Sequence, residues 1–277
     1  MQNETFELID EAIGGNKAAL EALVLSVENM IYNLSLRMLG SPHDAQDASQ
    51  EIIIKIITQL SSFRKESAFP TWVYRIATNY LINYKKTMFA QRSLSFEYYG
   101  EDIDAGFVQN TPALLQNVDE NILTDELKQS CTNVMLQCLD PESRCIYVLG
   151  LMFKVDSKIC AEIFSTTPEA YRQRLSRIRK KMAEFLGEYC GLSKTGKCNC
   201  QKRIGYAITA GRLDPSNLEY SKLEKIYKNA FTQAMEEMDE LSLIFANLPQ
   251  YRVPKATKAF LDELLSSDSM KCIKAEG

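Results

Sequence analysis

The chain has 277 residues, of which 45% are hydrophobic and 25% are charged, and its formal net charge is -4. The chain is therefore long and apolar enough to form hydrophobic cores, either in one large domain or in two to three small ones. The N-terminus lacks the basic start and apolar run of a signal peptide, and Lys55 interrupts the apolar residues 52–57. We therefore expect a cytoplasmic protein without membrane insertion.

Signals for helix starts recur along the chain. Ser41, Asp140 and Thr167 each place a capping side chain directly before a proline, whose missing N–H costs nothing in the first turn of a helix. No segment shows the alternation of apolar and polar residues that would predict a strand. The predicted fold class is all-α, with two small helical domains, a linker and a helical extension.

The first predicted domain comprises residues 1–88. Apolar residues recur at intervals of three and four over residues 16–39, 42–60 and about 68–86, which predicts three amphipathic helices. A short helix is expected before Gly14. Together these helices predict a small bundle.

A linker and a second helical domain follow. Residues 89–119 are the predicted linker, because residues 94–119 contain five acidic side chains and no Lys or Arg. We expect this linker to be extended. Helical periodicity returns at Ile122, so residues 120–186 are the second predicted domain.

Residues 187–277 form a predicted C-terminal extension. It begins with a Gly- and Cys-bearing joint, and an apolar stripe over residues 223–245 predicts a long amphipathic helix. One more helix is expected after Pro254.

The second domain ends in a strongly basic helix. Residues 172–181 hold six cations and no acid. The apolar residues from Tyr171 to Phe185 alternate spacings of four and three, so they form one buried stripe and leave the cations on the solvent-facing arc. A short helix at residues 156–164 and a turn at 165–167 precede it. This arrangement is typical of helix-turn-helix proteins, whose second helix enters the DNA major groove.

A solvated charged face on an ordinary helix is the alternative interpretation of these cations. The absence of a compensating acid and the preceding turn favour DNA, where Arg donates paired hydrogen bonds to guanine and cations neutralise phosphates. The candidate DNA-binding residues are Arg172, Gln173, Arg174, Arg177, Arg179 and Lys180.

Two segments carry a family resemblance. The sequence DSKICAEIFSTTPEAYRQRLSRIRKKM, residues 156–182, resembles region 4 of the bacterial extracytoplasmic-function sigma factors. It departs from the family at Ser165, which stands at the usual glycine, and at Gly150, which interrupts the preceding apolar run. Residues 41–86 resemble sigma region 2, with the segments DAQDASQE, FRKESAF and TWVYRIATN. The resemblance implies a group 4 sigma factor, which binds bacterial core RNA polymerase and directs it to promoter DNA.

The helix after residue 68 offers cations, amides and tyrosines, a mixture that suits single-stranded DNA. The resemblance implies that this helix and the loop at residues 63–69 capture unpaired minus-10 bases, whereas the helix from Pro168 recognises the minus-35 duplex. Trp72 is expected to be a core residue, and Pro70 occupies a position that is often basic in the family. The candidate minus-10 residues are Arg75, Asn79, Asn83, Lys85 and Lys86.

An acidic strip precedes that helix. Asp44, Asp47 and Glu51 are spaced by three and four, so they share a helix face beside Gln50. The strip is either a docking surface or a solvated face. Asp44 and Asp47 lie near the start of the predicted helix, where their negative charge interacts favourably with the helix dipole. The resemblance implies that this face binds the coiled coil of the largest polymerase subunit. It also implies that the acidic linker approaches the polymerase active centre and RNA exit path, although a solvated tether fits its composition equally well.

Eight cysteines are present, and the length of the chain argues against a secreted disulfide framework. Four of them fall on apolar helical stripes, where Cys packs as a small hydrophobe: Cys131, Cys138, Cys145 and Cys160.

Cys190, Cys198 and Cys200 form a C-x7-C-x-C pattern in the joint. They either hold zinc or another thiophilic metal, with Cys272 as a candidate fourth ligand, or are reduced thiols that pack a turn. Some sigma factors of this class carry extensions with a similar start and a P-x-Y-x-x-P stretch, here residues 249–254, which implies regulation in cis.

An enzyme is not predicted, because His43 is the only histidine and no pair of nucleophile and base is evident. The main alternative is a polymerase-independent helix-turn-helix regulator that binds a palindromic operator as a dimer. A third interpretation is an adaptor that only scaffolds polymerase. An anti-sigma factor is a further partner that the resemblance admits.

Overall fold

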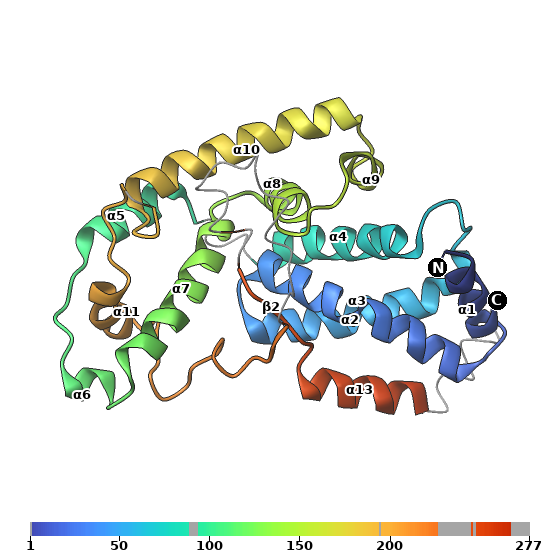
Figure 1. The fold of residues 1–277 in the computed structure, drawn as a ribbon, viewed down its shortest axis with the longest axis horizontal. Coiled ribbons are helices and arrows are strands. Elements are labelled where there is room, and N and C mark those ends of the chain that lie inside the picture. Colours follow the sequence, from blue (N-terminus) through green and yellow to red (C-terminus); the bar gives the residue numbers. More distant parts are fainter. Residues whose placement is uncertain (1, 89–93, 194, 227–244, 246–247, 267–277) are drawn as a thin grey trace. The chain divides into compact units, whose positions relative to one another are not determined.

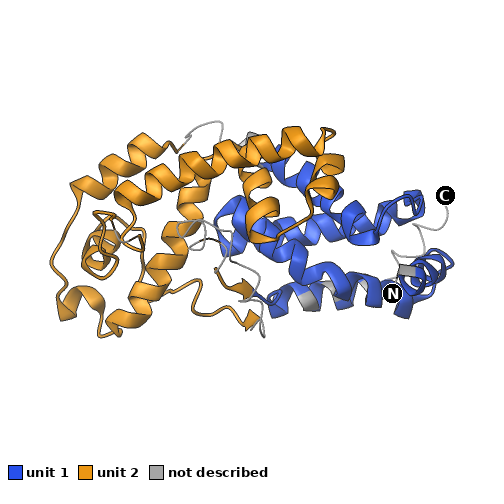
Figure 2. Ribbon diagram, turned by 45° about the horizontal axis from the view of Figure 1, so that its top comes forward, with its two compact units in different colours: residues 1–85, 251–277 blue, residues 86–250 orange. Residues whose placement is uncertain are grey.

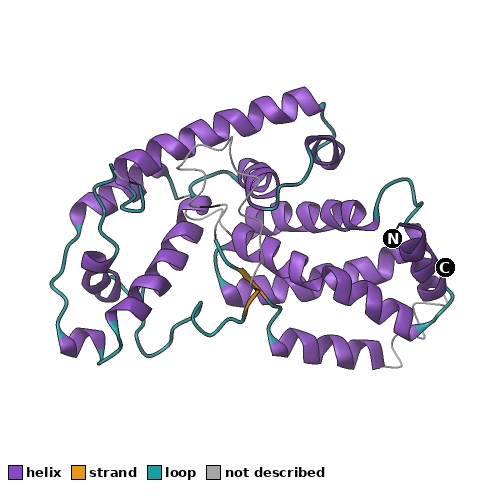
Figure 3. Ribbon diagram, in the orientation of Figure 1, coloured by secondary structure: helices purple, strands orange, loops and turns teal. Residues whose placement is uncertain are grey.

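The computed structural model describes the chain except for residues 1, 89–93, 194, 227–244, 246–247 and 267–277 (Figure 1). The described residues are helical apart from loops and two strands of two residues each, β1 (Lys225–Ile226) and β2 (Gln250–Tyr251), as Figure 3 shows. The predicted all-α fold class is therefore confirmed. None of the helices in the described ranges is long and apolar enough to span a bilayer.

The chain divides into two compact units (Figure 2). One unit contains Met1–Lys85 together with Tyr251–Gly277, and the other contains Lys86–Gln250. The second unit therefore contains the predicted linker, the second predicted domain and most of the predicted extension. The last part of the extension belongs to the same unit as the first predicted domain.

The first unit is built from helices whose bounds lie close to those predicted. Its elements are α1 (Gln2–Ile13), α2 (Lys17–Leu39), α3 (Pro42–Gln59), η1 (Leu60–Ser62), α4 (Phe69–Met88) and α13 (Lys255–Ser266). The Asn16 side chain caps α2 by accepting the N–H groups of Ala18 and Ala19, and Gly40 ends α2 with a φ of 77°. The Ser41 hydroxyl caps α3. These caps satisfy terminal backbone groups that would otherwise lack partners.

The core of the first unit lies where α1 and α3 pack on α2. Val24, Val27 and Ile31 of α2 are almost completely buried, as are Ile52 and Ile53 of α3. These residues recur at the helical period, so the bundle forms as the apolar pattern predicts.

The second unit comprises shorter helices around one long helix. Its elements are α5 (Phe96–Ala105), α6 (Pro112–Leu115), α7 (Glu120–Gln137), α8 (Pro141–Tyr147), η2 (Val148–Met152), α9 (Ser157–Ile163), α10 (Pro168–Tyr189), η3 (Gln201–Arg203) and α11 (Ile204–Thr209). The helix α10 contacts α5, α8 and α9, and α11 contacts α6 and α7.

The predicted extended linker is wrong over α5. Ser95 Oγ accepts the N–H of Tyr98 at 3.1 Å and starts the helix. Phe96, Tyr99 and Ile103 are buried, so the acidic residues of this segment alternate with an apolar stripe. The composition of the segment suggested a tether, but its periodicity gives an amphipathic helix that packs on α10.

The first part of the extension packs into the core of the second unit. Ile204, Ala207 and Leu213 form a buried cluster with Leu115 and Leu123, which come from α6 and α7. The extension is thus continuous with the second predicted domain up to at least residue 213 rather than a separate module.

The predicted long helix of the extension is wrong at its start. Leu223 lies in a turn and Ile226 lies in β1. Residues 227–244, which carry most of the predicted apolar stripe, lie outside the described residues. The helix expected after Pro254 is confirmed as α13.

Candidate functional site

The second unit contains the expected helix-turn-helix. The short helix α9, a turn and α10 follow in order, and Thr167 Oγ1 caps α10 by accepting the N–H of Ala170 at 3.2 Å. Ser165 in the turn has a φ of 50°, which is the left-handed region that glycine adopts without steric cost. This backbone conformation gives a physical reason for the glycine that the family has at this position.

Gly150 lies in η2, where the backbone approaches α10 closely. A Cβ at Gly150 would lie 2.6 Å from Tyr171 Oη and 2.7 Å from a methyl carbon of Leu175. Tyr171 itself is buried and donates its hydroxyl to the Ile146 carbonyl at 3.1 Å. The glycine that interrupts the apolar run therefore permits α10 to pack on η2, and it fixes α10 within the unit.

At least four cations of α10 have partners that lie outside residues 172–181, and one of these is Lys180, whose Nζ lies 4.0 Å from Glu184. Arg174 pairs with Glu142 of α8 at 2.8 Å. Arg172 pairs with Glu169 at 2.8 Å, and Lys181 Nζ lies 5.1 Å from the centre of the Phe96 ring. Local charge counting missed Glu142 because it lies on another helix.

The exposed polar face of α10 is narrower than predicted. Gln173, Arg177 and Lys180 are exposed and occupy positions i, i+4 and i+7, so they share one face. Arg172 is also exposed, whereas Arg174 and Arg179 are half-buried. The expectation that every cation occupies the solvent-facing arc is therefore wrong for these two arginines.

The helix α4 of the first unit presents a second polar face. Arg75, Asn79 and Asn83 are exposed and recur at intervals of four residues, so they lie along one side of the helix. Lys85 and Lys86 are in the same helix, and their side chains are outside the described structure. One cation and two amides therefore form the described part of the predicted minus-10 surface.

Aromatic side chains around α4 are mainly structural. The Trp72 ring centre lies 5.3 Å from that of Phe63 and 6.0 Å from that of Phe69, so Trp72 packs against core residues but is itself only half-buried. Tyr80 and Tyr84 stack on each other at 5.8 Å. The pKa of Tyr80 is raised, first by burial and then by the negative charge of Glu51.

The acidic strip lies on α3 beside these tyrosines. Asp47 and Glu51 are exposed, and Asp44 and Gln50 are half-buried, whereas the opposite face of α3 supplies buried core residues. His43 Nδ1 lies 3.5 Å from Asp47. The structure thus gathers the predicted polymerase-binding side chains on one accessible face.

The cysteines of the joint do not converge as a metal site within the described ranges. No group of three His, Cys, Asp or Glu side chains there is placed to hold a metal ion. Cys198 donates to Cys200, which lowers the pKa of Cys200 to about 7. Cys190 is buried, and Cys272 lies outside the described residues. A thiophilic metal at Cys190, Cys198 and Cys200 stays a prediction.

The P-x-Y-x-x-P stretch docks on α2 of its own unit, which sequence reasoning missed. Asn33 Nδ2 donates to the Tyr251 carbonyl at 2.7 Å, and the Tyr251 N–H donates to Asn33 Oδ1 at 2.8 Å. The Val253 N–H donates to Asn29 Oδ1 at 2.8 Å. Tyr251 is fully buried, so two asparagine side chains bind this backbone much as a neighbouring strand would.

A buried ionic cluster joins α5 to the extension. Asp102 accepts hydrogen bonds from Arg203 Nη2 at 3.0 Å, from Tyr206 Oη at 2.7 Å and from both terminal nitrogens of Arg212. Arg203 also donates to three backbone carbonyls around the end of α5. Sequence reasoning assigned Asp102 only to an acidic tether.

A second clamp involves Glu126 of α7. Its carboxylate accepts the backbone N–H groups of Glu219, Tyr220 and Ser221, the last two at 2.8 Å. Glu126 is 4% exposed, so these bonds fix the extension loop on α7 in a buried setting. No sequence pattern marks this contact, because the donors are backbone groups.

Comparisons with known proteins find one family and several relatives of the chain. The family "Sigma-70 region 2" matches residues 23–87. The RNA polymerase sigma-H factor of Pseudomonas aeruginosa is 28% identical over 187 residues, which are 67% of this chain and 95% of the relative. The ECF RNA polymerase sigma factor SigW of Bacillus subtilis is 26% identical over 62% of this chain and 91% of its own.

A third relative extends the agreement to another bacterium. The ECF RNA polymerase sigma-E factor of Escherichia coli is 29% identical over 62% of this chain and 89% of its own. The matched family region contains α3 and nearly all of α4, and these relatives are covered almost in full. The region 2 match and these relatives support assignment of the chain to the extracytoplasmic-function group of the RNA polymerase sigma-70 family, and so a function as a transcription initiation factor.

Proposed function

We propose that this protein binds bacterial core RNA polymerase through α3 and directs it to promoters through α10 and α4. In this proposal α10 reads minus-35 duplex DNA, and α4 contacts unpaired minus-10 bases. The observation that carries it is the presence of two exposed polar faces on separate units, Gln173, Arg177 and Lys180 on α10 and Arg75 and Asn79 on α4.

The chemistry of the α10 face fits duplex recognition. Arg177 can donate two parallel hydrogen bonds to a guanine edge, Gln173 can pair with adenine, and Lys180 can contact a phosphate. The chain as a whole is acidic, at -4, so tight binding to DNA without polymerase is not expected. Polymerase then supplies the remaining affinity, as the names of the relatives suggest for those proteins.

Promoter selection with a single-residue variant tests the proposal. Arg177→Ala is expected to weaken selection at one upstream position by about tenfold, because a bidentate base contact contributes about 1–3 kcal/mol. Lys202→Ala removes one exposed cation of the same unit outside α10 and should leave selection unchanged. Transcription from a promoter library with core polymerase measures both variants.

Equal selection by wild-type protein and Arg177→Ala would argue against the role of α10. Tight binding of the isolated protein to a palindromic site, with no effect of polymerase, would instead support the polymerase-independent regulator.

We infer in addition that the extension regulates the protein in cis. Two contacts support this: Tyr251 docks on α2, within the family region, and Arg203 docks on α5 through Asp102. Asn33→Ala leaves the buried N–H and carbonyl of Tyr251 without that partner, which costs about 2–4 kcal/mol for the pair.

We expect Asn33→Ala to release the tail from α2 and to change protein-dependent initiation by several-fold. Limited proteolysis near residue 251 measures release, and run-off transcription measures initiation. Release of the tail without any change in initiation would count against regulation through this contact.

A further inference from the structure

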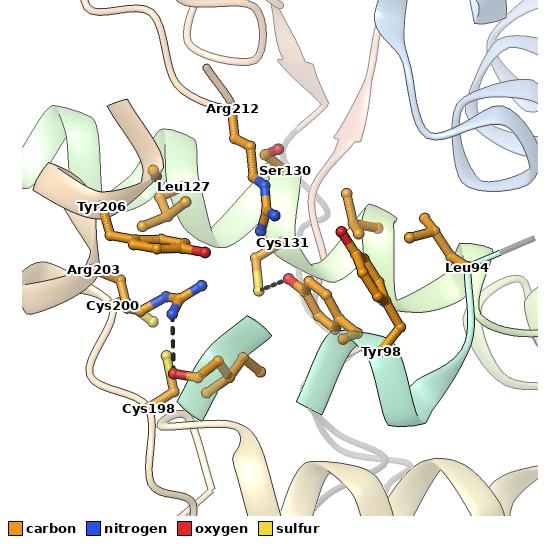
Figure 4. Close-up of a pocket in the computed structure, with 14 residues that line it drawn as sticks. Leu94, Tyr98, Leu127, Ser130, Cys131, Cys198, Cys200, Arg203, Tyr206 and Arg212 are labelled. Carbon is orange, nitrogen blue, oxygen red and sulfur yellow. Dashed lines mark hydrogen bonds between the residues drawn. The ribbon is translucent and has the colours of Figure 1, made fainter. Parts of the chain in front are cut away.

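A cavity of about 680 Å³ lies within the unit of residues 86–250 (Figure 4). Its walls come from three parts of the chain: the segment around α5, the helix α7, and residues 198–212 of the extension. This volume falls within the roughly 300–1,000 Å³ that small-molecule sites occupy. Neither the sigma surfaces nor the comparisons account for it.

Most of the cavity wall is apolar or aromatic. Tyr98, Tyr99 and Tyr206 contribute rings, and Leu127 and Val134 of α7 contribute aliphatic side chains. Figure 4 shows Tyr98 and Tyr206 on opposite sides of the space into which Arg212 extends. Walls of this kind favour a flat aromatic body, which gains both apolar burial and ring contacts.

The charged side chains of the cavity wall are two arginines, and no Asp or Glu lines it in the described structure. Behind the wall, the single carboxylate of Asp102 faces both Arg203 and Arg212. The ionic cluster therefore carries one positive charge in excess. The pKa of Cys200 is lowered to about 7 by its hydrogen bond from Cys198, so its thiolate offsets part of this excess at neutral pH. The remaining positive charge favours an anionic ligand.

The two arginines differ in how available they are. Arg203 has a side chain only 9% exposed, and its Nη1 group donates to the carbonyls of Asp102, Ile103 and Gly106, so its role is structural. Arg212 is 39% exposed, and among the described contacts two of its nitrogens bind Asp102. A guanidinium has five N–H donors, so Arg212 retains donors for a ligand.

We propose that this cavity binds a small aromatic carboxylate, with its rings between Tyr98 and Tyr206 and its carboxylate on Arg212. The cavity exists only while the extension is packed on α5 and α7. A ligand that binds this packed arrangement stabilises it by mass action. The inference goes beyond the transcription function, and its test requires no polymerase.

Isothermal titration calorimetry of the full chain with an isosteric pair of probes tests the proposal. Naphthalene-2-carboxylate carries the anionic group, and naphthalene-2-carboxamide has nearly the same shape without charge. We expect the carboxylate to bind wild-type protein about tenfold more tightly than the amide, because a charge-assisted pair with Arg212 is available only to the anion.

Two variants locate the binding in this cavity. Arg212→Gln should raise the Kd of the carboxylate about tenfold and leave that of the amide within about twofold. A misfolded protein would lose both probes, so this selective loss is specific to the charge contact. Ser130→Phe places a ring in the cavity from α7 and should abolish binding of both probes. Arg172→Gln changes an exposed arginine outside the cavity and is the matched control.

The proposal is overturned if neither probe binds the wild-type protein, or if the carboxylate and the amide bind with equal affinity. It is also overturned if Arg172→Gln lowers the affinity for the carboxylate as much as Arg212→Gln does, or if Ser130→Phe binds both probes as tightly as the wild-type protein. Far-UV circular dichroism of each variant checks that the helices are retained.

Discussion

The ionic cluster around Asp102 predicts that a single substitution loosens the extension from α5. Asp102 and Arg203 have side chains only 7% and 9% exposed, and Asp102→Asn leaves the buried guanidinium without its counter-charge. Breaking a buried ion pair from one side costs about 3–5 kcal/mol. We take about 3 kcal/mol, because the amide oxygen still accepts a hydrogen bond and the partly exposed Arg212 is screened by water.

A loss of about 3 kcal/mol raises the opening equilibrium of this contact by about two orders of magnitude. Hydrogen exchange measured by mass spectrometry should therefore show about 100-fold faster exchange for the backbone of α11 in Asp102→Asn. Asp104→Asn is the matched control on the same helix, since Asp104 lies 3.6 Å from Lys197 and both side chains are about half exposed. Such a surface pair contributes about 0–1 kcal/mol.

The comparison between the two variants decides the argument. If Asp102→Asn and Asp104→Asn accelerate exchange of α11 to the same extent, the buried ionic cluster around Asp102 does not hold the extension on α5.

Two further predictions concern the helix-turn-helix and the acid limit of the extension contact. Ser165→Gly should stabilise the protein by about 1 kcal/mol in urea unfolding, because Ser165 has a φ of 50°; no gain would mean that its backbone is not strained. Burial raises the pKa of Asp102, but hydrogen bonds from Arg212 and Tyr206 outweigh it, so the net pKa is lowered. The Asp102 carboxylate therefore stabilises the extension contact fully above its unfolded pKa of about 4, and this stabilisation is lost as the pH falls through the lower folded pKa. Backbone hydrogen exchange of α11, corrected for its intrinsic rate, should rise in that acid range in wild-type protein and not in Asp102→Asn.

The elements that depend on local pattern could be predicted from the sequence. The bounds of α2 and α3 follow from the apolar period and, for α3, from the cap at Ser41, and the structure reproduces them within one residue. The turn before α10 was likewise visible, because Thr167 and Pro168 mark a helix start.

The contacts between distant segments could not be predicted in this way. Asp102 and Arg203 are 101 residues apart, and each has an ordinary local context. Glu126 binds backbone N–H groups, which every residue except proline carries, so no side-chain pattern marks the partner. The half-buried state of Arg174 depends on Glu142, which lies on another helix. Sequence reasoning therefore predicted the helix α10 but overestimated how many of its cations face solvent.

Run-off transcription from a random promoter library, with purified bacterial core RNA polymerase in the presence and absence of this protein, tests the central claim most directly. The account predicts protein-dependent transcripts whose templates share two short sequence elements at a fixed spacing. Transcripts that are the same with and without the protein, under conditions in which the protein is folded, would contradict it.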